Sequence, residues 1–440
     1  MFLHYLELMI KLIKKEVKLI MVYVISKDGV PLMPTNRHGK VRHLLEEGKA
    51  KVVSKEPFTI KLLYDSTLYT QDLTLGVDTG SGTFATAVTD NNNNVVYTSE
   101  VQVRNDITDK MKQRAKYRRN RRNHKTRYRK ARFLNRKNSK KLDGHSPTMK
   151  SKLYSHIKEI EYIKSILPIS KLVLETATFD THLMKNPNIN RHWGYQKGLN
   201  YSFENTKAMV LNRDNYKCQF CKGKHKDSKL EVHHIIFRSK GGSDEQDNLI
   251  TLCHTCHKNL HDDKIKPNFK GKTKGNLKYA TQMNEIRSQL LKHYPEAIET
   301  FGFITKANRL ENKLPKEHYV DACMIASCGQ SIKFKTNIVY CKKSVAKGDY
   351  QRTKGVRSEI VIPNYKIQGF NKFDKVLYKG NKYFIKGRYS TGYAILMNIN
   401  GVTQKFINPK IPKMNSLVKL QSRKTTLTDS NVIKALNLCH

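Results

Sequence analysis

His233 and His234 stand side by side in a short apolar stretch typical of a β-strand, and His257 and His261 follow further along the chain. Because adjacent residues of a strand point to opposite faces, a purely structural pair would bury one imidazole and expose the other. His257 and His261 are four residues apart, so a helix would present both on one face. Imidazoles bind metal ions and accept protons near neutral pH, so the pattern indicates metal-assisted chemistry.

Two Cys-x-x-Cys pairs enclose the first two histidines. Cys218 and Cys221 form one pair, and Cys253 and Cys256 form the other. Four thiolates at this spacing predict a tetrahedral structural zinc site, although the interval between the pairs is longer than in most zinc ribbons. The alternative is four unligated thiols in a core. The opening residues do not resemble a secretory signal, which favours a reducing compartment.

A second set of reactive residues is spread over the chain. Asp78 and Glu175 each come at the end of an apolar, strand-like segment, and His318 and Asp321 stand three residues apart on a predicted helix. Open α/β sheets bind ligands at the carboxyl ends of their strands, and two-metal phosphodiester cleavage needs clustered carboxylates. Each residue alone is weak support, because strand-end acids are common and a His/Asp pair on a helix is often only a surface contact.

The charge of the chain indicates a polyanionic partner. Lys and Arg number 82 against 37 Asp and Glu, a net charge of +45 over 440 residues. Residues 110–141 are about half Lys and Arg without a single acid, so an isolated helix there would repel itself unless phosphates neutralised it. An anionic membrane is the weaker alternative, because no apolar run approaches the ~18 residues of a membrane span.

Elements that could position these residues follow from periodicity and turn chemistry. The predicted elements are three short strands over residues 72–101, an amphipathic helix over 147–167, a buried strand over 170–176, a compact insert over 204–265, helices over 276–294 and 316–328, and short strands with glycine turns from 331 onward. The last region predicts a small β-barrel or a curled sheet.

The insert resembles the HNH nuclease family: a His-His pair near a strand end, a Gly-rich loop with Asp-Asn-Leu at 247–249, and a helix starting at "CHTCH". In that family's ββα-metal arrangement the resemblance implies that His233 binds Mg²⁺ or a similar ion and that His234 is the general base. Asn248 would orient the loop or contact the metal. His257 and His261 are both candidates for completing the metal site, and the choice between them stays open.

The dispersed acids resemble the split motifs of the RuvC branch of the RNase H fold. The resemblance implies that Asp78, Glu175 and Asp321 are Mg²⁺ ligands and that His318 activates the attacking water. The order of RuvC motif one, Arg-rich helix, motif two, HNH insert and motif three is similar to that of CRISPR type II effectors and of IscB proteins. Residues 31–34, Pro-Leu-Met-Pro, match the namesake of the IscB PLMP domain, so residues 21–420 or so are identified as a member of the IscB family.

The resemblance implies an α/β multidomain protein with an RNase H-like (RuvC) fold split in three segments. Residues 1–20 are either an amphipathic helix or upstream translation, with Met21 as the genuine start. The expected divisions after them are a PLMP domain at 21–70, RuvC segment I at 71–107, an arginine-rich bridge helix at 108–140, RuvC segment II at 141–190, a linker at 191–203, the zinc-containing HNH domain at 204–265, RuvC segment III at 266–335, and a β-barrel-like domain that reads a target-adjacent motif at 336–440.

The activity implied is cleavage of double-stranded DNA under the direction of an omega guide RNA, by a monomeric cytoplasmic ribonucleoprotein with no membrane and no obligate protein partner. HNH would cut the guide-paired strand and RuvC the displaced strand, with Mg²⁺ or Mn²⁺ at both sites and structural Zn²⁺. The candidate nucleic-acid contacts are Arg114, Arg118, Arg119, Arg121, Arg122, Arg127, Arg129 and Arg132 on the bridge helix, and Lys375, Lys379, Lys386 and Arg388 in the C-terminal region.

Two alternatives from other classes remain open. A protein-guided HNH endonuclease of the homing kind would read DNA directly and need no RNA; the split acids and the basic helix argue against it. A catalytically idle protein would bind guide RNA and DNA without cutting, although all the expected catalytic residues are present.

Overall fold

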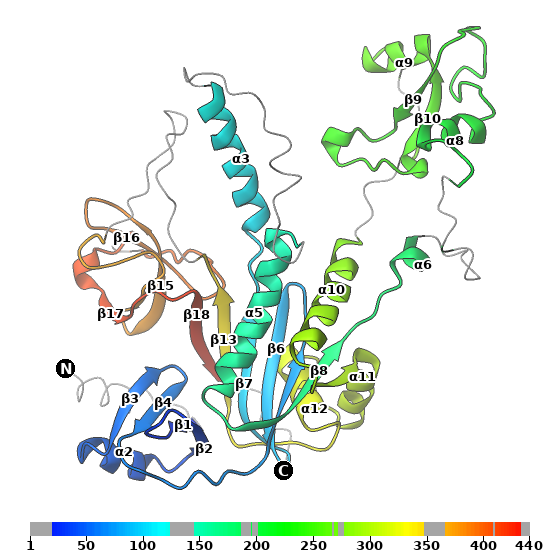
Figure 1. The fold of residues 1–440 in the computed structure, drawn as a ribbon. Coiled ribbons are helices and arrows are strands. Elements are labelled where there is room, and N and C mark those ends of the chain that lie inside the picture. Colours follow the sequence, from blue (N-terminus) through cyan, green and yellow to red (C-terminus); the bar gives the residue numbers. More distant parts are fainter. Residues whose placement is uncertain are drawn as a thin grey trace. The chain divides into compact units, whose positions relative to one another are not determined.

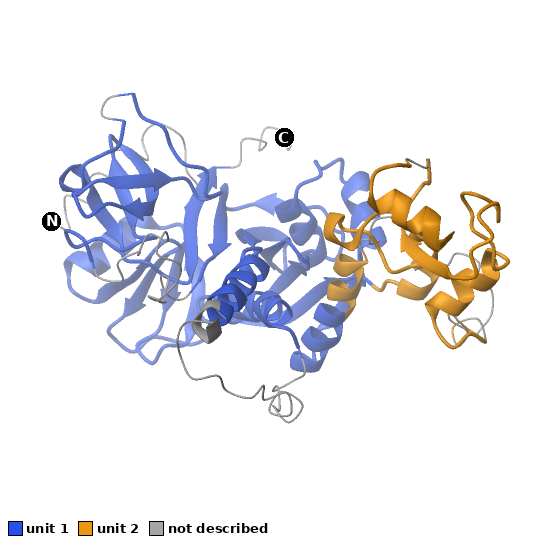
Figure 2. Ribbon diagram, turned by 90° about the horizontal axis from the view of Figure 1, so that it is seen from above, with its two compact units in different colours: residues 1–177, 285–440 blue, residues 178–284 orange. Residues whose placement is uncertain are grey.

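The computed structural model describes residues 20–123, 145–185, 195, 201–265, 268–271, 277–346, 366–407 and 410–432. The chain divides into two compact units, residues 1–177 with 285–440 and residues 178–284 (Figure 2). The second unit is wider than the insert predicted at 204–265. Residues 1–19 of the predicted N-terminal segment, and the basic residues 124–141, lie outside the described part.

The first unit is built on an eight-stranded mixed sheet (Figure 1). Its strands are β5 (Leu73–Asp78), β6 (Thr83–Asp90), β7 (Asn94–Gln102), β8 (Ile169–Thr176), β11 (Ile298–Phe301), β12 (Lys333–Phe334), β13 (Ile338–Ser344) and β18 (Thr426–Val432). The order is β11-β8-β5-β6-β7-β13-β18, with β12 also beside β7. The meander β5-β6-β7 and the strand β8 confirm the strands predicted from the sequence.

Helices cover both faces of this sheet. α5 (Pro147–Lys164) begins at Ser146, whose hydroxyl accepts a hydrogen bond from the amide of Met149, and it confirms the helix predicted over 147–167. α5 packs on the face that carries Phe84, and α12 (His318–Ala326) packs on the opposite face with Ala85. The unit also contains α3 (Ile107–Asn123), α10 (Lys278–His293) and α11 (Gly302–Glu311), and α10 continues into it from residues 178–284.

Gly76 in β5 explains how closely α12 approaches the sheet. A Cβ built on Gly76 would lie 2.4 Å from the amide nitrogen of Ala326 and 2.6 Å from the carbonyl oxygen of Ala322. Any larger residue would push α12 away from β5. The glycine therefore sets the distance between Asp78, two residues later on β5, and the first turn of α12.

Two smaller sheets flank the large one. The N-terminal sheet has the order β2-β1-β4-β3, and the C-terminal sheet has the order β16-β15-β14-β17. The elements are β1 (Val22–Ile25), β2 (Pro31–Thr35), α2 (His38–Glu46), β3 (Ala50–Lys55) and β4 (Phe58–Leu62), then β14 (Lys375–Tyr378), β15 (Asn381–Arg388), β16 (Ala394–Met397), the 3₁₀ turn η3 (Met414–Ser416) and β17 (Val418–Gln421).

The C-terminal region has the predicted strands but not the predicted boundary. Its described strands β14–β17 pair as a four-stranded sheet, and a bridge between Tyr393 and Lys413 joins the start of β16 to the segment before β17, in keeping with a small barrel or curled sheet. The boundary predicted at residue 336 differs, because β13 pairs in parallel with β7 and antiparallel with β18. Both strands therefore belong to the large sheet, which local sequence patterns could not reveal because their partners are distant in the chain.

The second unit holds a hairpin followed by a helix. Its elements are α6 (Thr181–Lys185), α8 (Thr206–Arg213), β9 (Leu230–His234), the 3₁₀ turns η1 (Arg238–Lys240) and η2 (Gln246–Asn248), β10 (Leu249–Cys253) and α9 (His254–His261). β9 and β10 are antiparallel, with His234 opposite Leu249 and Leu230 opposite Cys253. This confirms the ββα arrangement.

Within the described residues, no helix has the length and apolar character needed to cross a membrane.

Candidate active sites

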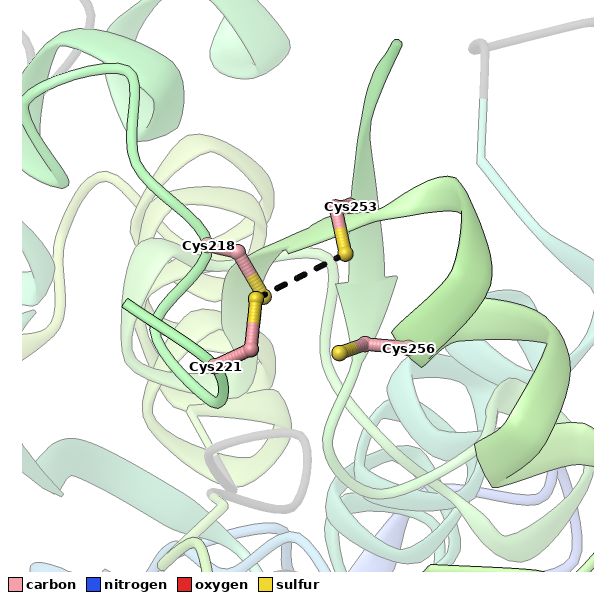
Figure 3. A group of neighbouring side chains, drawn as sticks. All are labelled: Cys218, Cys221, Cys253 and Cys256. Carbon is pink, nitrogen blue, oxygen red and sulfur yellow. Dashed lines mark hydrogen bonds between the residues drawn. The ribbon is translucent and has the colours of Figure 1, made fainter. Parts of the chain in front are cut away.

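The four cysteines of the Cys-x-x-Cys pairs converge on one point in the second unit (Figure 3). Cys218 and Cys221 follow α8, whereas Cys253 ends β10 and Cys256 lies in the first turn of α9. All four are buried free thiols, and Cys221 Sγ lies 3.8 Å from Cys253 Sγ. Tetrahedral zinc with Zn–S bonds of about 2.3 Å would separate its sulfurs by about 3.8 Å. The residues fit a structural zinc ion.

Three imidazoles form a second cluster beside this knot. His233 of β9 and His257 and His261 of α9 have potential ligand atoms that all lie within 4.8 Å of one another. His257 Nε2 is 3.3 Å from His261 Nε2, the separation expected of two nitrogens that share a tetrahedral ion at about 2.0 Å. The structure thus brings both helical histidines to His233, where the sequence left the choice between them open.

Glu231 positions His257 within this cluster. Its Oε2 lies 2.7 Å from His257 Nδ1, so the ring proton is held on Nδ1 and the lone pair of Nε2 faces His261. Hydrogen bonds from Lys229 and then His254 hold the pKa of Glu231 at about 2, so it stays ionised. Burial, followed by the charges of His257 and His261, lowers the pKa of His233 to about 4, which keeps its ring neutral and able to bind metal.

His234 points to different partners from His233, as strand alternation requires. Its Nε2 lies 2.9 Å from Asp244 Oδ1, and Arg238 Nε lies 2.6 Å from the same oxygen. A carboxylate acceptor at Nε2 places the ring proton there and leaves the lone pair on Nδ1. Sequence reasoning missed Glu231 and Asp244. Glu231 could have been found, because it stands two residues before His233 on the same face of the strand.

Asn248 ties the loop between β9 and β10 together. It is fully buried; its Nδ2 donates to the carbonyls of Ile236 at 2.9 Å and Ser243 at 2.8 Å, and its Oδ1 accepts from the amide of Ile236 at 2.9 Å. Both sides of the amide are therefore used within the loop. Of the two roles expected for Asn248, the structure supports loop orientation rather than contact with a metal.

The acids of the large sheet gather at one edge. Asp78 and Glu175 are register partners on the parallel strands β5 and β8. His318, the first residue of α12, places Nδ1 2.9 Å from Asp78 Oδ2, and Asp321 lies one turn further along α12. Among the described residues the cysteine and histidine groups are the tight clusters within 4.8 Å, so these acids are more widely spread than either.

Electrostatics at this edge favour a cation. Burial, and then the charge of Asp78, raises the pKa of Glu175 to about 7, and its buried Oε2 has no hydrogen-bond partner among the described residues. Burial and Asp78 likewise raise the pKa of Asp321. Arg309 Nε lies 2.9 Å from Asp321 Oδ1 and forms an ion pair with it. An unsatisfied buried carboxylate oxygen beside other acids fits a divalent ion.

His156 and Gly302, both missed in the sequence, support this edge. His156 of α5 is fully buried and stacks on Phe84 with ring centroids 4.0 Å apart. Its Nδ1 lies 2.9 Å from the carbonyl oxygen of Lys152, and its Nε2 accepts from the Gly80 amide at 3.4 Å, which holds the loop that follows Asp78. A Cβ on Gly302 would lie only 3.0 Å from Glu175 Oε1, so the start of α11 lies directly against this carboxylate.

The predicted nucleic-acid contacts have different environments. Arg114, Arg118 and Arg119 are exposed on α3; the side chains of Arg121 and Arg122, and all of Arg127, Arg129 and Arg132, lie outside what the structure describes. Lys386 donates to Thr403 Oγ1 at 2.6 Å, Arg388 donates to the carbonyl of Phe370 at 3.0 Å, and Lys379 lies over the ring of Tyr378.

Lys375 departs from its predicted role. Its side chain is only 3% exposed and forms ion pairs with Glu56 and Asp429. Its ammonium is therefore occupied inside the fold and is not presented to a phosphate. Its place at the start of a short strand, where the predicted contacts with nucleic acid rested on basic residue type, gave no sign of this burial.

Comparison with known proteins matches two regions of the chain. The family described as "RRXRR protein" matches residues 22–198, and the HNH endonuclease family matches residues 218–263. Anaredoxin of Nostoc sp. is 35% identical over 66 residues, which cover 15% of this chain and 84% of that protein. The type IV methyl-directed restriction enzyme EcoKMcrA of Escherichia coli K12 is 40% identical over 62 residues, 12% of this chain and 22% of the enzyme.

The matched segment of 218–263 contains the four cysteines together with His233, His234, His257 and His261. Its ββα geometry, its three converging imidazoles and its neighbouring His234 are the features that a metal-assisted nuclease needs. Residues 218–263 therefore form an HNH endonuclease domain, and this domain supports a nuclease activity for the chain.

Proposed function

We propose that this protein is an RNA-guided DNA endonuclease of the IscB type with two nuclease sites, one in each compact unit. The observation that carries the proposal is that each unit holds its own set of phosphodiester-cleaving residue types: three imidazoles beside His234 in one, and Asp78, Glu175, His318 and Asp321 at one sheet edge in the other. The HNH domain alone would account for only one strand break.

In the HNH unit, His233, His257 and His261 would hold a divalent ion, which when bound would stabilise negative charge on the phosphate. His234 is the general base: Asp244 fixes its proton on Nε2, so Nδ1 accepts the proton of the attacking water. Asn248 holds the loop that carries Asp244 against the end of β9. His234 and Asp244 thus serve the proton transfer, whereas Asn248 keeps the loop in position.

In the large sheet, Asp78, Glu175 and Asp321 would hold the ions of an RNase H-like, RuvC-type site. Two ions ~3.5 to 4 Å apart need ligands spread over both of them. The wider spacing of these acids, compared with the cysteine and histidine clusters, is therefore compatible with a two-ion site. His318 lies at the mouth of this set with more than half of its side chain exposed, where it can orient water. The hydrogen bond that His318 donates to Asp78 raises the pKa of His318 and fixes its ring toward that carboxylate.

The donor atoms favour different ions at the two sites. Carboxylate oxygens suit Mg²⁺ and Mn²⁺, whereas imidazole nitrogens suit Zn²⁺, Ni²⁺ and similar ions. We therefore assign Mg²⁺ or Mn²⁺ to the acids, and we assign a transition-metal ion to the three histidines in place of the Mg²⁺ expected from the sequence.

RNA guidance is supported by charge and by the resemblance of the split motifs. A net charge of +45 suits a protein enclosed by nucleic acid, and the exposed Arg114, Arg118 and Arg119 on α3 offer forks for phosphates. The protein-guided alternative requires cutting without RNA. The idle alternative requires binding without cutting.

Plasmid cleavage tests the proposal. Protein co-expressed with RNA from its genomic flank is compared with Asp78→Ala, His234→Ala and the double variant, in Mg²⁺ with and without added Zn²⁺ or Mn²⁺. Matched controls are His43→Ala and Asp109→Asn, which change exposed residues outside both sites.

The expected result is a double-strand break that becomes a nick in each single variant, on opposite strands, and no cleavage in the double variant. Cutting that persists after RNA removal would overturn RNA guidance in favour of direct readout. Nicking in the parent protein that Asp78→Ala leaves unchanged would overturn the second site.

A further inference from the structure

A cavity of about 340 Å³ opens in the first unit between α5, β13 and the strands β17 and β18, which are labelled in Figure 1. None of the acids at the ends of β5 and β8 lines it. Most of the residues that line it carry a hydroxyl or an ammonium group, among them Ser155, Ser344, Thr425, Thr426, Lys158 and Lys424.

The acids in the cavity wall are already neutralised. Glu159 is buried in an ion pair with Lys342, 2.5 Å from its ammonium, and accepts further hydrogen bonds from the hydroxyls of Tyr97 and Ser99. Glu56 forms ion pairs with Lys375 and Lys382. The carboxylates at the base of the cavity therefore add no net negative charge to it.

Two lysine side chains at the rim, Lys158 and Lys424, give the cavity its net positive charge. Lys158 Nζ donates to Thr425 Oγ1 at 2.5 Å and to Thr426 Oγ1 at 2.8 Å, which leaves one of its three donors for another acceptor. Within the described residues neither Lys158 nor Lys424 forms an ion pair with a carboxylate. Burial, and then the charge of Lys424, lower the pKa of Lys158, against the opposing effect of the Glu159 carboxylate. Glu159 is itself paired with Lys342, so Lys158 and Lys424 leave the rim with an excess of positive charge.

We propose that this cavity binds a phosphate group of a nucleic-acid strand, with Lys158 and Lys424 supplying charge and the hydroxyls of Thr425 and Thr426 supplying hydrogen bonds. A cation that holds two threonine hydroxyls by their oxygens turns their hydrogens outward, toward an acceptor. Ser155 and Ser344, whose oxygens lie 3.4 Å apart, line the same wall. Charge-assisted hydrogen bonds of this kind are the usual means of holding phosphate oxygens.

A neighbouring cavity favours a strand over a free phosphate ion. It has a volume of about 190 Å³ and shares Glu56, Gln421 and Lys424 with the first, and it leads on to Lys55. The two cavities therefore adjoin at these shared residues. A single phosphate ion would fill only a small part of their combined space, whereas a nucleotide and its neighbours would occupy more of it.

The inference does not depend on cleavage, and binding by the full-length protein tests it. The probe is a fluorescent single-stranded oligoribonucleotide, with either a 5′-phosphate or a 5′-hydroxyl. The double variant Lys158→Ala/Lys424→Ala should bind roughly tenfold or more weakly than the parent, because hydrogen bonds to charged groups are lost. The charge-matched control is Lys51→Ala/Lys171→Ala, which removes two exposed lysines outside the cavity.

A second variant separates the site from general attraction to a basic protein. Thr426→Val removes a hydroxyl without changing charge, so it should weaken binding while leaving the salt dependence unchanged. The lysine variants should flatten the salt slope by about 0.7 for each phosphate that the protein no longer neutralises. Thermal unfolding of every variant establishes that it is folded, and Lys424→Ala alone replaces the double variant if Lys158→Ala unfolds the protein.

Weakening confined to the 5′-phosphorylated probe would assign the cavity to a terminal phosphate, and equal weakening of both probes would assign it to an internal phosphodiester. The proposal is overturned if the cavity variants and the charge-matched control lose the same affinity, or if Thr426→Val binds as the parent does. Either outcome leaves the two nuclease sites unaffected, because plasmid nicking reports on those separately.

Discussion

The adjacent histidines of β9 have different contacts because a strand alternates its side chains. His233 is buried and faces the two imidazoles of α9, whereas His234 contacts Asp244 in the following loop. Two consecutive positions near a strand end can therefore supply a metal ligand and a base to one small site. A shift of one position along the strand would move each imidazole to the opposite face and away from its present partners.

His234→Ala should reduce HNH-dependent strand cutting by about 10²- to 10⁴-fold, the usual contribution of a general base, and leave metal binding intact. His257→Ala should instead lose the metal. Single-turnover cutting of the guide-paired strand and bound metal measured by mass spectrometry distinguish the two variants. Loss of metal from His234→Ala would contradict the division of roles.

His156 should make the stability of the first unit depend on pH. Burial lowers its pKa to about 4, whereas the unfolded histidine has a pKa near 6.5. Between these values the unfolded state binds a proton that the folded state does not, so the free energy of unfolding falls as pH decreases, by up to about 1.4 kcal/mol per pH unit. Above pH 6.5 this contribution is constant.

Thermal unfolding from pH 7.5 down to pH 4 in the parent and in His156→Gln measures this dependence. The variant should be less stable at pH 7, since it loses the hydrogen bonds to Lys152 and Gly80, and its stability should fall less steeply with acid. Parallel pH profiles of the two proteins would refute the assignment.

At the scale of elements, α5 is attached to the sheet by a buried polar network. Lys342 of β13 donates to Glu159 of α5 and, at 2.7 Å, to the Tyr97 hydroxyl of β7. The lysine and glutamate side chains are 3% and 6% exposed. A charge so enclosed is tolerated only with its partner, so the network fixes which residues of α5 face the sheet.

Lys342→Met should destabilise the first unit by about 3–5 kcal/mol, because Glu159 would be left buried and unpaired. The double variant Lys342→Met/Glu159→Leu should recover a large part of that loss. Denaturant unfolding of both single variants and the double variant completes the cycle. Additive losses in the double variant would show that the pair is not coupled.

At the scale of the whole molecule, the two units depend on different kinds of stabilisation. Residues 1–177 with 285–440 bury a large sheet between helices, whereas residues 178–284 surround a small cluster that contains the four cysteines. A small core of this kind usually needs a metal ion to remain folded. The chain should therefore not unfold as a single cooperative body.

Removing zinc should unfold the second unit and leave the first intact. Calorimetry of the full chain with a chelator should show the loss of one transition and no change in the other, and Cys256→Ser should reproduce this loss. Cys328→Ser, which changes an exposed thiol outside the knot, is the matched control. Loss of both transitions on chelation would contradict independent stabilisation of the units.

Local signals were enough to predict the secondary structure and the short-range parts of the sites. The meander β5-β6-β7, the helices α5 and α12 and the ββα hairpin follow from periodicities and turns a few residues long. The cysteine knot and the helical histidine pair follow from spacing alone. Such features depend on neighbours in the chain, so the residues that specify them are all visible in one window.

Pairing over long distances was decided only by the tertiary structure. The sheet order places β13 beside β7 and β18 at its edge, so the large sheet extends past the boundary predicted at residue 336. Glu231 and Asp244 become partners of histidines only when the hairpin closes, and Lys375 becomes a buried cation only when Glu56 and Asp429 meet it. The physical reason is that residue type reports what a side chain can do, whereas burial and partner charge, which select among those possibilities, come from segments brought together by folding.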